Sequence, residues 1–159
     1  MAPRAAARLE SLGFHKVHEY KPGKLDWLAA GLPTEGTNAA RTRAGTVARR
    51  DVPVCALHDR LGDVADRVGR AGWQAVVVVD ERRVVLGLLR AGELAKDRDL
   101  AIEAAMRPAP STFRPYVSIE EMADYMTKHN LESSPITLLD GTLVGLLFRA
   151  DAVRAAGAS

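Results

Sequence analysis

Hydrophobic positions follow the same spacing in two separate stretches of the chain. Apolar residues recur at intervals of three and four positions, at Leu61, Val64, Ala65 and Val68 and again at Ile119, Met122, Ala123 and Met126. This spacing puts the side chains on one face of an α-helix. We therefore predict amphipathic helices over 61–68 and 119–126, which lie 58 positions apart.

Short apolar runs follow each predicted helix. Residues 75–79 and 135–139 are mostly apolar, and an aspartate follows each run. The runs 85–89 and 143–147 come next, and they are again 58 positions apart. Short apolar runs separated by turn residues are typical of β-strands. We therefore predict a β-hairpin after each helix.

The repeated unit has five predicted elements. An apolar stretch over 52–57 predicts a strand before the first helix, and Ala-rich segments over 91–96 and 150–156 predict closing helices. The unit is therefore strand, helix, strand, strand, helix, written twice, and the fold class is α/β. Each copy carries apolar faces that it cannot cover alone, so the two copies should pack against each other.

The chain divides into three predicted parts. Residues 1–37 hold no copy of the unit and end in a turn-like string. Residues 38–50 are small and basic, which predicts a linker or an extended surface arm. Residues 51–159 hold the duplicated unit, with the first repeat at 51–98 and the second at 102–156.

Composition and charge narrow the functional classes. At 159 residues the chain has the size of one domain that can bury its own core. Its net charge of +2 argues against nucleic acid as the main partner. A single cysteine, Cys55, excludes a disulfide framework, and the isolated histidines predict no metal site. The apolar runs are far shorter than the roughly 20 residues of a membrane span, so we expect a soluble cytoplasmic protein.

Two strings near the ends of the copies carry a family resemblance. Residues 87–94 (Gly-Leu-Leu-Arg-Ala-Gly-Glu-Leu) and 145–151 (Gly-Leu-Leu-Phe-Arg-Ala-Asp) resemble the signature of cystathionine-β-synthase-type (CBS) domains. Residues 102–108 resemble the segment that usually introduces such a repeat, and the whole resemblance covers 46–155. It implies two repeats packed about a pseudo-two-fold axis. The two clefts of such pairs often hold adenosine derivatives such as AMP, ATP or S-adenosylmethionine.

The resemblance also implies roles for the signature residues. Its last position is usually an aspartate that grips ribose hydroxyls, and a Thr or Ser three positions earlier helps to hold phosphate or sugar. Here Asp151 keeps the carboxylate but Phe148 replaces the hydroxyl, while Glu93 and Arg90 stand at the two positions of the other copy. The departures leave alternatives open. Asp151 fits a ribose ligand or a helix N-cap, and Arg90 fits a phosphate ligand or a partner of Glu93.

Trp73 precedes a strand where the family usually has a smaller residue, so its ring would stack on a base or occupy the base's space. Residues 131–135 match the family's adenine wall. Together the candidate ligand-binding residues are Trp73, Gln74, Arg90, Glu93, Leu131, Ser133, Ser134, Pro135, Phe148, Arg149 and Asp151.

The first 37 residues resemble the C-terminal end of a rhodanese domain, without the enzyme that would precede it. The resemblance rests on Leu12-Gly-Phe14, Val17, Trp27 and the string Ala30-Gly-Leu-Pro33. It implies a small helix-strand-helix appendage, with the strand over 14–20. We expect Phe14, Val17, Trp27 and Leu28 to pack on the repeats, because they need cover from water.

These observations favour a non-catalytic regulatory or sensor module that binds an adenosine nucleotide. One alternative is a scaffold without a small-molecule ligand, in which Arg90, Phe148 and Trp73 plug the clefts. The other is a residual sulfurtransferase, which would require Cys55 to be an exposed thiol of low pKa near His58 and Arg60. By resemblance, we also expect a homodimer formed through the repeat helices. Met122, Tyr125 and Met126 would supply its apolar surface or, instead, an intramolecular core.

Overall fold

The computed structural model describes residues 2–36 and 39–158. The predicted helices are confirmed as α4 (Leu61–Arg70) and α7 (Ile119–Lys128). Each is followed by the predicted antiparallel hairpin. In the first repeat this is β2 (Ala75–Val79) with β3 (Val85–Arg90), and in the second it is β5 (Ser133–Thr137) with β6 (Leu143–Phe148). The α/β class and the duplication are therefore confirmed.

The sheets of the two repeats follow one plan. In the first, β1 (Val54–Cys55) pairs parallel with β2, and β4 (Arg107–Pro108) pairs antiparallel with β3. In the second, Phe113 forms a parallel bridge to Ile136, and Arg49 forms an antiparallel bridge to Leu146. These bridges lie 58 positions from the equivalent pairs of the first sheet, so the pseudo-symmetry extends beyond the predicted elements. The repeats close with α5 (Ala91–Leu94) and α8 (Arg149–Ala156).

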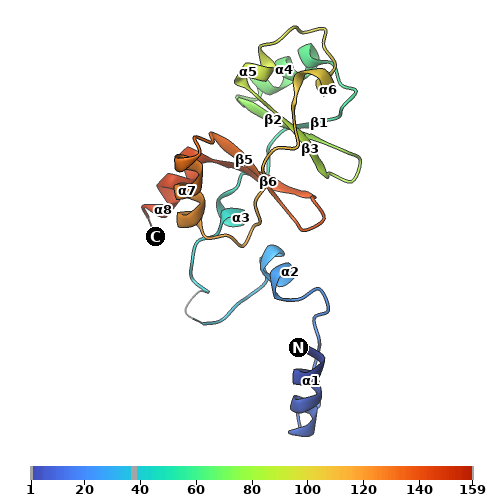
Figure 1. Ribbon diagram of the computed structural model, residues 1–159, viewed down its shortest axis with the longest axis vertical. Helices are drawn as coiled ribbons and strands as arrows, with labels where there is room; N and C mark the ends of the chain where they lie inside the picture. The colour runs from blue at the N-terminus through green and yellow to red at the C-terminus, as the bar shows by residue number, and fades with distance from the viewer. Residues whose placement is uncertain (1, 37–38, 159) are drawn as a thin grey trace.

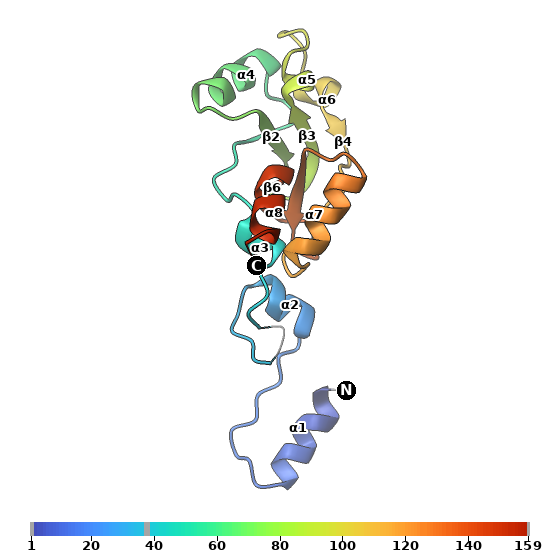
Figure 2. The same cartoon turned by 90° about the vertical axis from the view of Figure 1, so that its left-hand side faces the viewer.

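The segment before each repeat packs on the other repeat. The short helix α3 (Ala44–Val47) places Ala44 and Ala48 in the core of the second repeat, beside Ile119 and Met122. The equivalent helix α6 (Ile102–Ala105) lies in the core of the first repeat. Figure 1 and Figure 2 show α3 beside α8, far along the chain from it. Residues 44–49, expected as a solvated linker, are therefore part of the packed fold, because their alanines fill space that larger side chains could not.

A third core joins the repeats to each other. It contains Val77 and Leu88 from the first sheet and Leu143 and Leu146 from the second, all nearly inaccessible to solvent. The two hairpin tips are also joined, because the backbone N–H of Val85 donates to the Gly141 carbonyl at 3.1 Å. The repeats therefore form one continuous apolar interior, as their exposed strand faces predict.

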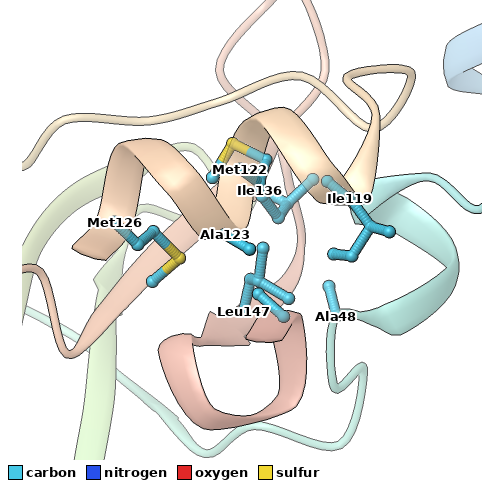
Figure 3. Packing of buried hydrophobic residues seen from close by; sticks show 9 residues of the cluster. Ala48, Ile119, Met122, Ala123, Met126, Ile136 and Leu147 are labelled. Carbon is cyan, nitrogen blue, oxygen red and sulfur yellow. The ribbon is translucent and has the colours of Figure 1, made fainter. Parts of the chain in front are cut away.

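The methionines of α7 face inward. Met122 and Met126 are 1% and 0% exposed, and Figure 3 shows them directed with Ile119 and Leu147 into the second repeat's core. The expectation that they form a surface for dimerisation is wrong. The three- and four-residue spacing that suggested an apolar surface is the core-facing stripe of this helix. Tyr125 is 39% exposed and lies on the outer side.

The N-terminal part differs from its prediction. It contains α1 (Ala2–Ser11) and α2 (Lys24–Ala29), but among the described residues no strand forms over 14–20. Phe14 is 59% exposed, so the expectation that it packs on the repeats is wrong. Figure 1 and Figure 2 show α1 at the end of the molecule farthest from the first repeat. Among the residues that the structure describes, no strand pairs with 14–20, so the alternating pattern alone does not produce a strand.

The other aromatic side chains of the N-terminal part pack instead against residues close to them in the sequence. Trp27 meets Tyr20 edge to face, with ring centroids 5.1 Å apart, and its indole N–H donates to the Pro33 carbonyl at 2.8 Å. Leu28, by contrast, lines a cavity shared with Tyr116 and Ser118 of the second repeat. Within the described residues, no helix is long and apolar enough to cross a membrane.

Candidate functional site

Each signature carboxylate forms an ion pair with an arginine from the segment that crosses onto its repeat. Arg107 Nε donates to Glu93 Oε1 at 2.6 Å, and Arg49 Nε donates to Asp151 Oδ2 at 2.8 Å. The two pairs are related by the 58-position period. The sequence leaves two roles open for Arg90, as a phosphate ligand or as a partner of Glu93, and its contact with Glu93 is made through the backbone. Arg90 donates its backbone N–H to Glu93 Oε2 at 3.1 Å, which caps the start of α5.

These contacts shift the carboxylate pKa values. The hydrogen bond from Arg49 is the main reason that the pKa of Asp151 is lowered; burial opposes it, and Arg154 lowers it further. For Glu93, burial is the largest influence and would raise the pKa. The hydrogen bonds from Arg107 and from the Arg90 backbone together outweigh burial, so its pKa is also lowered. Both groups are therefore buried carboxylates held in the charged form.

Two glycines permit the crossing segments to lie against the sheets. A Cβ on Gly145 would stand 2.6 Å from the carbonyl oxygen of Arg49, which is a backbone atom. A Cβ on Gly87 would instead meet the flexible side chain of Met106, and the Arg107 carbonyl oxygen at 3.2 Å. The signature glycines therefore have a structural role: they leave room for the backbone that carries Arg49 and Arg107.

One inter-repeat cleft is filled by aromatic rings. Trp73 of the first repeat and Phe148 of the second have ring centroids 6.1 Å apart. The Arg49 guanidinium lies 5.8 Å from the Trp73 centroid and 5.0 Å from the Phe148 centroid, within cation–π range. We call this site, formed by Arg49, Trp73, Phe148 and Asp151, the closed cleft. Trp73 and Phe148 therefore pack against each other between the two repeats.

The pseudo-symmetric position holds a cavity of about 210 Å³, which we call the open cleft. Leu131 replaces Trp73 there, and Arg90 replaces Phe148, at the same 58-position offset. The guanidinium NH2 group of Arg90 donates to the Ser133 carbonyl of the other repeat at 3.0 Å. The main lining residues are Leu88, Arg90, Arg107, Ser111, Leu131 and Ser134.

The remaining candidate residues have structural contacts or face solvent. Gln74 is exposed, and Arg149 donates to the Asn130 side chain at 2.8 Å. Ser133 and Pro135 are buried within β5, and the Ser134 hydroxyl donates to the Ser111 carbonyl at 3.3 Å. Asp151 accepts from Arg49 and from Arg154. The candidates therefore divide between two clefts instead of converging on one.

Sequence reasoning missed Arg49 and Arg107. Both lie beside the cleft carboxylates. A comparison of residues 58 positions apart would have paired them, because each follows a short Ala-containing segment at that offset. The pattern of helices and strands could not reveal that each segment crosses to the other repeat. Only the period itself, extended back to residue 44, would have indicated that they are equivalent.

Cys55 lies outside both clefts and is 4% exposed in the core of the first repeat. Burial is the main reason that its pKa is raised to about 12, and Asp59 raises it further. A thiol in this state carries almost no thiolate at neutral pH. The requirement of the sulfurtransferase alternative, an exposed cysteine with a lowered pKa, is not met.

The two-repeat architecture with a cleft on each side of the pseudo-two-fold axis defines a duplicated α/β module. The CBS domain family matches the chain at residues 44–100 and 98–158, which is most of its length. The chain therefore belongs to the CBS domain family. The first match begins at α3, so the crossing segment is part of the family's unit. No curated protein sequence matches the chain.

Solved structures share the fold at low sequence identity. The crystal structure of CBSX2 in complex with AMP superposes with a TM-score of 0.66 at 20% identity, covering 74% of this chain and 97% of that one. The CBS domain pair of protein MJ0100, in complex with 5'-methylthioadenosine and S-adenosyl-L-methionine, gives 0.66 at 18% identity and covers 74% and 98%. The cytosolic domain of the Mg²⁺ channel MgtE with ATP gives 0.65 at 22% identity, covering 71% of this chain and 48% of that one.

Proposed function

We propose that this chain is a non-catalytic regulatory module that binds an adenosine nucleotide in the open cleft. The observation that carries the proposal is the cavity between the repeats, lined by two arginines. Three structures with the same fold were solved in complex with adenosine compounds. A nucleotide bound there would contact both repeats and so link their relative positions to its concentration, as a sensor requires.

The open cleft combines polar and apolar lining in a way that suits a nucleotide. Leu131 offers apolar surface to a base, while Arg90 and Arg107 offer positive charge to phosphate. A larger cavity in the first repeat has the opposite charge. The cavity of about 460 Å³ beside Cys55 is lined by Asp59, Asp80 and Glu81 and would repel an anion.

Thermal unfolding of the full chain with millimolar AMP, ATP, NAD or S-adenosylmethionine tests this function. A ligand present at 100 times its Kd adds about 2.7 kcal/mol of stability, which is several degrees for a domain of this size. A shift with an adenosine nucleotide supports the proposal. The absence of a shift with all four compounds contradicts it and favours a scaffold.

The scaffold alternative has one observation in its favour, which is the closed cleft. Trp73, Phe148 and Arg49 already occupy the space in which a second ligand would lie. A module of this kind would act by binding protein, and we propose the outer faces of α7 and α8 as the homodimer surface. Tyr125 and Val153 are 39% and 49% exposed there. Analytical ultracentrifugation of the wild type and of a Tyr125→Asp, Val153→Asp variant would show whether this surface joins two copies.

A further inference from the structure

We infer that the open cleft recognises its ligand through a phosphate group held by Arg90 and Arg107, and not through ribose hydroxyls held by Glu93. This inference rests on the proposed function and names the chemical feature that the cleft requires. It separates phosphate-bearing nucleotides such as AMP and ATP from adenosine and S-adenosylmethionine, which carry no phosphate.

Arg90 is a cation without an acidic partner among the described residues. Its Nε atom is buried and has no hydrogen-bond partner there, while its NH2 group donates to the Ser133 carbonyl at 3.0 Å. A buried donor without a partner costs stability unless a ligand or water supplies an acceptor. Arg90 lines the cavity, so an anion in the open cleft would neutralise its charge, and a small shift of the guanidinium toward that anion would give the Nε donor an acceptor.

Glu93 is 6% exposed, and each of its carboxylate oxygens already accepts a hydrogen bond. One oxygen accepts from Arg107 Nε at 2.6 Å and the other from the Arg90 backbone N–H at 3.1 Å. The described residues that line the open cleft do not include Glu93. The carboxylate therefore pairs with Arg107 and caps α5 instead of facing a ligand.

Arg107 supplies a second cationic group at the same cavity. Its contact with Glu93 uses Nε, and 63% of its side chain is exposed. Arg90, Arg107 and Glu93 together carry a net charge of +1, which favours an anion over a neutral nucleoside. The cavity of about 210 Å³ is smaller than the roughly 300–1,000 Å³ of ligand pockets, so it encloses only part of a nucleotide. The two arginines that line the cavity make the phosphate the part that enters.

Isothermal titration of the full chain with AMP, adenosine, S-adenosylmethionine and inorganic phosphate tests the inference. AMP should bind at least about tenfold more tightly than adenosine or S-adenosylmethionine. Equal binding of adenosine and AMP would overturn the inference while leaving the proposed function intact. No binding by any of the nucleosides or AMP would overturn the proposed function itself. Inorganic phosphate that binds as tightly as AMP would support an anion site formed by the arginines. It would overturn the proposal that the ligand is an adenosine nucleotide.

Matched variants distinguish phosphate binding by the two arginines from ribose binding by Glu93. Arg90→Gln and Arg107→Gln should each weaken AMP at least about tenfold. Arg107 is exposed, so its variant keeps the test valid if Arg90→Gln fails to fold. Glu93→Gln should leave AMP binding unchanged or tighter, whereas a ribose grip requires that it weaken. The control is Arg49→Gln, which breaks the equivalent ion pair in the closed cleft and should leave AMP affinity unchanged. Weakening by Glu93→Gln together with full affinity in Arg90→Gln would contradict the inference.

Discussion

The open and closed clefts are built on the same backbone plan, but their side chains differ, most visibly at two pairs of equivalent positions. Each has a carboxylate at the end of its signature, an arginine from a crossing segment, and an ion pair between them. The closed cleft has Trp73 and Phe148 where the open cleft has Leu131 and Arg90. Duplication therefore preserves the framework, while two side chains in each cleft decide whether a cavity remains.

This comparison also explains why the signature residues alone are a poor guide to binding. Asp151 has the residue type that the family resemblance associates with ribose, yet it lies in the closed cleft and accepts from two arginines. Arg90 departs from the signature, yet it lines the cavity. The chemistry of a cleft depends on which groups remain unpaired after folding.

The largest expected effect on stability comes from removing the Trp73 ring from the closed cleft. Trp73→Ala should lower the free energy of unfolding by about 3 kcal/mol, because it removes a large ring packed against Phe148 and Arg49. Chemical denaturation measures this value. The matched change Leu131→Ala in the open cleft should cost less, because that side chain borders a cavity. Equal losses would show that the two clefts are packed alike.

Substitution of Gly145 or Gly87 should have an intermediate effect on the free energy of unfolding. Gly145→Ala should destabilise the chain by about 2 kcal/mol, because its Cβ would meet the rigid backbone of Arg49. Gly87→Ala should cost less, because its closest neighbour is the movable side chain of Met106. Thermal melts of both variants, compared with the exposed control Gly69→Ala, measure the difference. A larger loss in Gly87→Ala would mean that the first repeat holds its crossing segment more rigidly.

The smallest expected effect is the pH dependence of the Arg49–Asp151 pair. The folded state lowers the pKa of Asp151, so the pair stabilises the fold above the unfolded pKa of about 3.9. This contribution is lost as pH falls through the lower folded pKa. Asp151→Asn should therefore cost about 1 kcal/mol at pH 7 and should flatten the decline in stability between about pH 5 and pH 2. Urea unfolding across this range measures both, and an unchanged slope would contradict the assignment.

The regular elements could be predicted because their signals are local. The apolar stripe of α7 contains its own periodicity, and β2 is a short apolar run between turn residues. The predicted run 135–139 lies 60 positions from the run 75–79, whereas β5 begins at Ser133 and so keeps the 58-position offset. The role of α3 could not be predicted in this way, because a short Ala-rich segment carries no information about which repeat it contacts. The exposed Phe14 shows the same limit: an alternating pattern needs a neighbouring strand, and within the described part of the chain none pairs with residues 14–20.

The site was predicted only in part, for a related reason. The family resemblance selected Arg90, Glu93 and Asp151 as ligand candidates, and the structure places Arg90 at the cavity. The resemblance could not show that Glu93 prefers Arg107 to Arg90, because that choice depends on a contact across 14 positions and a crossed segment. Tertiary pairing, rather than local sequence, decides which charges remain free.

The number of AMP molecules bound per chain tests the central claim most directly. The account predicts one site by calorimetry or equilibrium dialysis, lost or at least tenfold weaker in Arg90→Gln and unchanged in Arg49→Gln. Two equivalent sites per chain would contradict the account, because the closed cleft would then bind AMP despite its aromatic filling. One site whose binding is lost in Arg49→Gln but kept in Arg90→Gln would also contradict it, because the ligand would then lie in the closed cleft.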